Sequence, residues 1–127
     1  MRGRHGVAYL PAKHPIHDFK NAVRAAGVLN FERPLDGPVK VVLQFVFQRP
    51  RSHWNKKGLK PNAPAIPPKN DFDNLAKAAT DPLNGIAWHD DDQITSALIV
   101  RRYAGLRDEP GRTVITVSTD EDHRAAD

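Results

Sequence analysis

The sequence contains no cysteine, so disulfide bonds and thiolate-bound zinc are excluded. It also lacks an apolar run long enough to span a bilayer, and its first residues lack the hydrophobic region of a signal peptide. We therefore expect a cytoplasmic protein with no membrane association. No internal repeat is present, and 127 residues, of which 39% are hydrophobic and 27% charged, are typical of one globular domain.

Charge is distributed unevenly along the chain. Residues 1–60 carry twelve Lys/Arg and three Asp/Glu, a net charge of +9, whereas residues 61–127 carry seven and twelve, a net charge of −5. A basic half beside an acidic half suits a protein that binds a polyanion with one part and a metal ion with the other. Chance variation in charge is an equally good explanation of this asymmetry alone.

Hydrophobic periodicity predicts two helices. Apolar residues recur at helical spacing from Ile16 to Leu29, and Gly27 is expected to end that helix. The second helix is expected to begin at Asp71, a favourable N-cap, and to stop near Thr80 because Pro82 opposes helical geometry. A tight turn is expected at Asn84-Gly85.

Alternation and apolar content predict the strands. From Val39 to Gln48 both faces of the segment are largely apolar, which indicates a central strand. Other extended segments are expected at 6–10, 86–88, 93–103 and 113–118. Together these elements predict a single-domain α+β (mixed α/β) fold, with one small mixed sheet packed by two helices.

A basic arm is expected at 1–15, around the extended segment 6–10. A basic, proline-rich loop at 49–68 and a frayed tail at 119–127 are expected to lack regular structure. Basic residues interleaved with a tryptophan are typical of a nucleic-acid surface, where cations meet phosphates and an aromatic ring stacks on a base. The other interpretation is a solvated arm and a solvated basic loop. The candidate DNA-binding residues are Arg2, Arg4, Lys13, Arg49, Arg51, Trp54, Lys56, Lys57, Lys60 and Lys69.

The stretch from Lys69 to Ile94 concentrates six aspartates around Lys77. Oxygen ligands without cysteine or a histidine cluster suit magnesium or manganese. Magnesium can activate water and neutralise charge at a phosphate, and a lysine on the same helix face can assist there. The stretch therefore predicts metal-dependent phosphodiester chemistry.

Each feature of the acidic stretch also has an ordinary explanation. Asp71 can be a helix cap, Asp73 and Lys77 an ion pair four residues apart, and Asp90 to Asp92 a solvated turn. A calcium-binding loop does not fit, because counting from Asp71 the sixth residue is Ala76 rather than glycine.

The run DFDNLAKAATDPLNG, followed by DDDQI, resembles the RusA-type crossover-junction endodeoxyribonucleases, whose pattern is D-x-D-N-L-x-K, then D-x-L, then D-D-x-Q. The resemblance is specific from Asp71 to Ile94 and extends more loosely over about four-fifths of the chain. It implies a magnesium-dependent homodimer, bacterial or of prophage type, that resolves Holliday junctions by paired symmetric nicks in DNA recombination and repair.

The resemblance also implies roles for individual residues. It assigns metal binding to Asp71, Asp73 and Asp91, with Asp90 and Asp92 as rivals for one ligand position, and it makes Lys77 the catalytic lysine. Asn74 and Asp81 belong to the motif and are expected to orient the site or its helix. Magnesium is the expected metal, and manganese is the alternative.

The chain departs from the family pattern at its start, where a strand ahead of the basic arm is expected to be missing, and at Pro82, which disturbs the position of Asp81. Two other functions also fit the sequence. One is a non-catalytic nucleic-acid-binding module, and the other is a nuclease that acts on flaps or other branched DNA.

Overall fold

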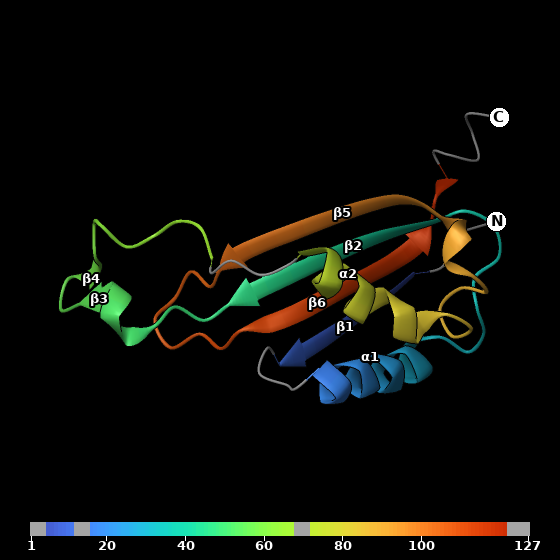
Figure 1. Cartoon of the computed structure of the whole chain (residues 1–127), viewed down its shortest axis with the longest axis horizontal. Helices are drawn as coiled ribbons and strands as arrows, with labels where there is room; N and C mark the ends of the chain where they lie inside the picture. Colours follow the sequence, from blue (N-terminus) through green and yellow to red (C-terminus); the bar gives the residue numbers. More distant parts are fainter. Residues whose placement is uncertain (1–4, 12–15, 68–71, 122–127) are drawn as a thin grey trace.

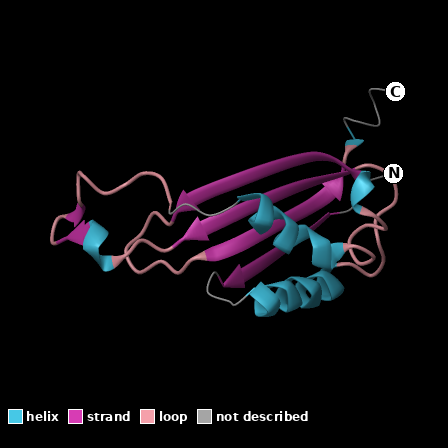
Figure 2. Ribbon diagram, in the orientation of Figure 1, coloured by secondary structure: helices cyan, strands magenta, loops and turns pink. Residues whose placement is uncertain are grey.

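A four-stranded sheet forms the body of the molecule in the computed structural model, which describes residues 5–11, 16–67 and 72–121, and side chains for 19–67 and 73–121. The strand order is β1-β6-β2-β5. β2 and β5 are parallel, whereas β6 runs antiparallel to both β1 and β2 (Figures 1 and 2). The strands are β1 (His5–Pro11), β2 (Val39–Phe47), β5 (Ile94–Tyr103) and β6 (Arg112–Thr119). This is the mixed sheet that the sequence predicted.

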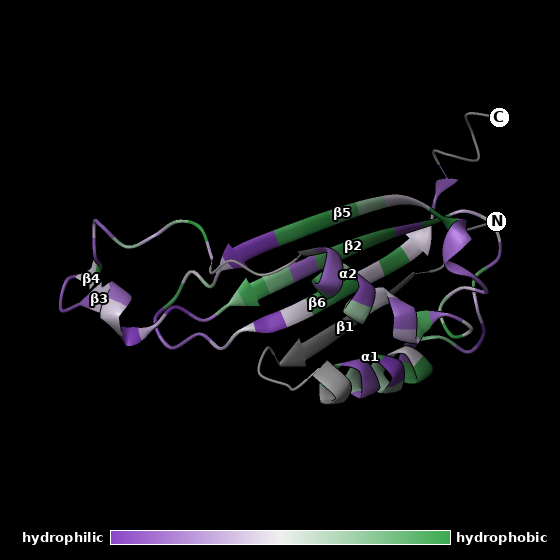
Figure 3. Ribbon diagram, viewed as in Figure 1, coloured by the Kyte–Doolittle hydropathy of each residue, from purple (hydrophilic) through white to green (hydrophobic). Residues whose placement is uncertain are grey.

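β2 occupies an interior position in the sheet, as its apolar sequence predicted. It pairs with β5 on one side and β6 on the other, and Val46 on its second face is buried like Val41 and Leu43 on the first. Hydrophobic residues dominate β2 and the middle of β5 (Figure 3).

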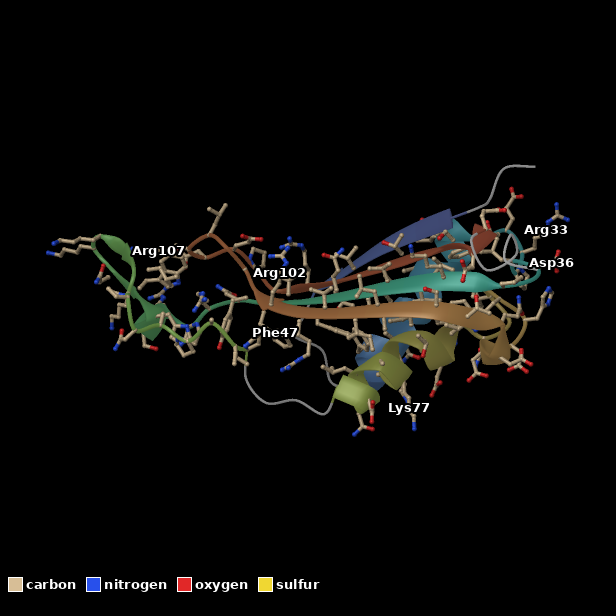
Figure 4. The ribbon with its side chains drawn as sticks, turned by 90° about the horizontal axis from the view of Figure 1, so that it is seen from above. Arg33, Asp36, Phe47, Lys77, Arg102 and Arg107 are labelled. Carbon is tan, nitrogen blue, oxygen red and sulfur yellow. The ribbon has the colours of Figure 1, made fainter. Side chains whose placement is uncertain are left out.

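Both helices, α1 (Ile16–Asn30) and α2 (Phe72–Thr80), pack on one face of the sheet (Figure 4). That face of the sheet contributes Val41, Leu43 and Phe45 to the core, while Val23 of α1 and Ala79 of α2 pack against it. Burial of these side chains is the main source of the fold's stability. Two helices on one small mixed sheet match the predicted α+β class.

Gly27 does not end α1, contrary to the prediction. The helix continues to Asn30, and a Cβ added at Gly27 would lie 2.7 Å from Leu83 Cδ2 and 3.0 Å from Ile86 Cγ2. The absence of a side chain at Gly27 therefore lets α1 lie close to the segment after α2. The apolar residues predicted to face the core also end before Val28, whose side chain is 63% exposed.

α2 ends at Thr80, as predicted, and a short 3-10 helix, η2 (Asp81–Leu83), follows with Pro82 in its first turn. Proline is tolerated there because the first backbone N–H groups of a helix have no intrahelical partner. The turn at Asn84-Gly85 is present, with Gly85 at φ +80°.

The segment 86–88 is not an extended piece as predicted, because Ile86 and Ala87 lie in a turn. The Leu83 carbonyl accepts hydrogen bonds from both of their backbone N–H groups. Trp88 alone forms isolated bridges, to Leu35 and Asn84, and its side chain is fully buried.

The loop from residue 49 onward contains regular structure, contrary to the prediction. It forms a short 3-10 helix, η1 (Arg51–His53), and a two-stranded hairpin of β3 (Trp54–Asn55) and β4 (Gly58–Leu59). Asn55 Oδ1 accepts a 2.9 Å hydrogen bond from the Lys57 N–H, which stabilises the turn despite the surrounding prolines. The hairpin projects beyond the end of the sheet (Figure 1).

The predicted frayed tail starts too early, because Thr119 belongs to β6 and Asp120 is buried. Thr95 Oγ1 donates a 2.7 Å hydrogen bond to Asp120, whose own N–H donates to the Pro38 carbonyl at 2.9 Å. Residues 122–127 lie outside the described part. At the other end, β1 forms an edge strand of the sheet, which confirms the extended segment predicted at 6–10. No helix in the described residues is long and apolar enough to cross a membrane.

Candidate functional site

One exposed stripe of α2 and η2 carries Asp73, Lys77 and Asp81. These residues are four apart, a spacing that places side chains on the same side of a helix. Ala78 and Ala79 on the opposite side are buried against the sheet, which fixes the orientation of the stripe. Lys77 points away from the sheet (Figure 4). Asn74 is also exposed, and Asp71 lies outside the described residues.

Gln93 makes four of the hydrogen bonds that hold the acidic loop, His89 to Asp92, in place. Its Oε1 accepts hydrogen bonds from the backbone N–H groups of His89 (2.7 Å) and Asp90 (3.0 Å). Its Nε2 donates to the carbonyls of Leu35 and Gly37, both at 2.9 Å. Gln93 closes the short 3-10 helix η3 (Asp91–Gln93) and ties it to the loop before β2.

Two further contacts fix the start of the loop. Trp88, buried just before the loop, donates a 2.6 Å hydrogen bond from Nε1 to Asn84 Oδ1. His89 Nε2 lies 2.8 Å from Asp36 Oδ1, so the loop also joins the segment before β2 through an exposed pair. These hydrogen bonds therefore fix the backbone of the loop that carries Asp90, Asp91 and Asp92.

The carboxylates of η2 and η3 are close enough to influence one another. A side-chain hydrogen bond with Asp90 raises the pKa of Asp91 above its ordinary value, and slight desolvation adds to this. The negative charges of Asp90, Asp81 and Asp92 raise it further. Repulsion among oxygen-rich groups is the condition that a hard divalent cation relieves.

The described part of the chain does not bring three of the predicted metal ligands together. Among the described residues, no three Asp, Glu or His side chains converge closely enough to hold a metal ion. The predicted set includes Asp71, which lies outside those residues, so the assignment of Asp71, Asp73 and Asp91 stays a prediction. Asp81, expected to orient the site or its helix, adds to the negative charge around Asp91.

The predicted DNA-binding residues of the loop gather at the projecting hairpin. Arg51, Lys56 and Lys57 are exposed there, while Trp54 and Lys60 are partly buried. Arg2, Arg4, Lys13 and Lys69 lie outside the described residues. A cluster of cations on a projecting element suits contact with a phosphate backbone.

Arg49 differs from the other loop cations, because its guanidinium is used within the protein. It donates a 2.7 Å hydrogen bond to the Pro64 carbonyl and stacks 4.2 Å from the centre of the Tyr103 ring. These contacts attach the loop to the end of β5. Its role in the structure is therefore to position the hairpin.

Sequence reasoning missed Arg107, in the connection between β5 and β6. Its guanidinium lies 5.3 Å from the centre of the Trp54 ring and donates a hydrogen bond to the Asn55 carbonyl. Arg102, exposed near the end of β5, adds another cation at this end of the sheet (Figure 4). No local motif relates residues 102–107 to the loop, so only the fold reveals the cluster.

A mixed α+β domain with a braced carboxylate cluster and a separate basic projection has the features of a protein that acts on nucleic acid. Comparison with protein families matches residues 1–118 to Endodeoxyribonuclease RusA, and the chain belongs to the RusA endodeoxyribonuclease family. Membership indicates an endonuclease that acts on Holliday junction DNA. No individual curated protein matches the chain.

Proposed function

We propose that this protein is a magnesium-dependent endonuclease that resolves four-way DNA junctions by paired symmetric nicks. The observation that carries the proposal is the order of the motif on the fold: the exposed stripe of Asp73, Lys77 and Asp81 is followed by the acidic loop, which Gln93 fixes to the segment before β2. The negative charge of Asp81 in η2 also contributes to the raised pKa of Asp91 in η3.

Asp71, Asp73 and Asp91 would hold the cation in this proposal, with Asp90 or Asp92 able to supply a further carboxylate. The donor set is entirely oxygen, which fits magnesium or manganese. The bound ion would supply an activated water and would neutralise charge at the phosphate. Lys77, exposed on the same stripe, would contact the phosphate and stabilise its developing negative charge.

The hairpin cations would hold DNA at the other end of the sheet. β5 begins directly after η3 and ends at Tyr103 beside the hairpin, and ten residues extend about 33 Å at about 3.3 Å per residue. A span of that length covers roughly ten base pairs, at about 3.4 Å along each strand. One protomer can therefore contact DNA well beyond the cleaved bond.

A homodimer completes the proposal, because paired nicks on a two-fold symmetric junction require two sites related by the same symmetry. The sheet face opposite the helices supports an interface. Leu98 is 56% exposed on this face, and its register partner Val42 and its strand neighbour Val100 are partly buried. Apolar side chains in this arrangement are typical of a surface that another chain covers.

A cytoplasmic location stays a prediction from the sequence.

The deciding experiment is cleavage of a labelled synthetic four-way junction beside linear duplex and flap DNA. We expect symmetric nicks on the junction with magnesium and none with EDTA. Equal cutting of flaps would favour a nuclease for branched DNA in general. Junction binding without cutting in either magnesium or manganese would favour a non-catalytic module and would contradict the proposal.

A further inference from the structure

A cavity lies at the end of the molecule far from the acidic loop. Its volume is about 280 Å³, and its lining residues are Arg51, Trp54, Arg107 and Asp108. Arg107 lies at one end of the molecule, whereas Asp36, the hydrogen-bond partner of His89, lies at the other (Figure 4). The cavity is therefore distinct from the carboxylate cluster.

Trp54 and Arg107 form a fixed wall of this cavity. The guanidinium of Arg107 faces the indole ring at 5.3 Å and is anchored by its hydrogen bond to the Asn55 carbonyl. A cation held over a tryptophan is a favourable electrostatic arrangement. Because hairpin β3-β4 also restrains Trp54, the ring can receive a flat ligand without first becoming ordered.

Asp108 adds a hydrogen-bond acceptor to the wall. Its backbone has φ +61°, the single positive value among the non-glycine residues of the described chain. Aspartate tolerates this left-handed conformation better than most residues do. The connection between β5 and β6 thus adds an aspartate to the lining that Arg51 and Arg107 also form.

The chemistry of the wall specifies a ligand that is flat, negatively charged and able to donate a hydrogen bond. A nucleotide has all three properties: a base that stacks on an indole, a phosphate that pairs with guanidinium, and, except in thymine, an exocyclic amino group. Pockets for drug-sized ligands occupy roughly 300–1,000 Å³, so this smaller cavity suits a single base with its phosphate.

We propose that the cavity binds one unpaired DNA nucleotide, with its base against Trp54, its phosphate beside Arg51 and Arg107, and its amino group donating to Asp108. Bases with an exocyclic amino group, such as adenine and cytosine, are then preferred over thymine. The inference rests on DNA as the substrate in the proposed function but not on cleavage.

Tryptophan fluorescence provides a direct test without catalysis. Trp88 is fully buried, so a ligand at the surface changes the signal of Trp54, the other tryptophan in the sequence. The full chain is titrated in EDTA at fixed low salt with single-stranded octamers of dA, dC or dT and with an abasic octamer. We expect dA and dC to quench Trp54 and to bind roughly five- to tenfold more tightly than dT. The abasic strand should bind weakly and leave the fluorescence unchanged.

Three variants separate the cavity from general charge attraction. Arg51→Gln should weaken binding of every base about tenfold, because it removes a phosphate partner. Asp108→Gly removes the acceptor, keeps a residue that tolerates positive φ and should abolish the preference over dT. Arg33→Gln makes the same charge change at the opposite end (Figure 4) and should leave affinity unchanged.

Several results would overturn the inference. Equal weakening by Arg33→Gln and Arg51→Gln would indicate nonspecific attraction, and equal binding of the abasic strand would indicate phosphate contacts only. Tighter binding of an RNA octamer than of its DNA counterpart would assign the cavity to RNA. None of these measurements involves nicking, so a failure here is distinguishable from failure of the proposed nuclease activity.

Discussion

Asp91 is the residue whose chemistry depends most on its neighbours. Its carboxylate shares a hydrogen bond with Asp90 and lies within the field of Asp81 and Asp92, and together these contacts raise its pKa. The neighbouring negative charges therefore oppose ionisation of Asp91, and a bound cation would favour it. A raised pKa with specific charged neighbours marks Asp91 as a candidate site residue.

Replacing Asp73 by asparagine tests the proposed ligand set with a minimal change. Asp73→Asn should keep junction binding and reduce cleavage by at least about 100-fold, because a neutral amide is a weaker ligand for a hard cation. Binding by gel shift in EDTA and single-turnover cleavage in magnesium measure the two effects. Glu121→Gln, an exposed acid after β6, is the matched control and should cut normally. Normal cutting by Asp73→Asn would remove it from the site.

Asp91→Asn should raise the melting temperature of the metal-free protein at pH 7, because it relieves repulsion within the cluster. An acid whose folded pKa is raised binds more protons in the native state, so folding gains stability as pH falls through that pKa. The advantage of the variant should therefore shrink at pH 4, close to the ordinary pKa of 3.8 for this carboxyl. Thermal denaturation in EDTA at both pH values measures this. A variant less stable than the wild type at pH 7 would contradict the inferred repulsion.

Single residues also show where sequence reasoning stops. The exposure of Asp73, Lys77 and Asp81 follows from helical spacing and was predicted. The pairing of Arg107 with Trp54 was not, because the two residues are 53 positions apart in the chain and meet only when the loop attaches to the end of β5. Likewise, the engagement of Arg49 with Tyr103 depends on tertiary packing.

At the level of elements, η3 and its hydrogen bonds to the loop before β2 decide where the acids lie. Gln93 contributes four of the contacts, two as acceptor and two as donor. The D-D-x-Q pattern indicated that Gln93 belongs to the motif, but its partners Leu35 and Gly37 are more than fifty residues away. Its bracing role is a tertiary property that spacing cannot give.

Gln93→Glu separates the hydrogen bonds that the side chain accepts from those that it donates. The carboxylate still accepts the hydrogen bonds from His89 and Asp90, but it cannot donate to the carbonyls of Leu35 and Gly37. We expect a loss of about 1–3 kcal/mol in the free energy of unfolding, together with slower cleavage and unchanged junction binding. Urea denaturation and cleavage assays measure these effects. Gln48→Glu, at an exposed position after β2, is the control.

The regular elements were largely predictable because their periodicities reflect burial on one face. β2, β5, β6 and the end of α2 agree with the sequence to within one or two residues. The errors occurred where tertiary contacts override local signals. Gly27 permits α1 to approach Leu83 rather than ending the helix. The proline-rich loop folds into a hairpin, and Arg49 and His53, just before it, contact Tyr103.

The whole molecule is elongated: hairpin β3-β4 projects beyond one end of the sheet, and the acidic loop before β5 lies at the other end (Figure 1). β5 joins the two regions directly, so their separation is fixed by a paired strand rather than by a flexible linker. A substrate that engages both regions must extend along the sheet. Branched DNA with several helical arms meets this requirement.

Oligomeric state is the property of the whole molecule that the proposed mechanism needs most. We expect a mass of about 28 kDa, twice the 14.1 kDa chain, in light scattering after gel filtration. Leu98→Glu places a charge on the exposed sheet face and should give a monomer, because a buried unpaired charge opposes association. Leu29→Glu, at an 86% exposed position near the end of α1, should remain dimeric.

The same pair of variants connects assembly to paired cutting. If two sites must act together, Leu98→Glu should retain metal-dependent nicking of single strands but release few resolved duplexes from a four-way junction, whereas Leu29→Glu should resolve junctions normally. A supercoiled plasmid with an extruded cruciform separates these outcomes, because one nick relaxes the plasmid while two coordinated nicks linearise it. Linear product from a monomeric Leu98→Glu would show that coordination does not depend on this sheet face.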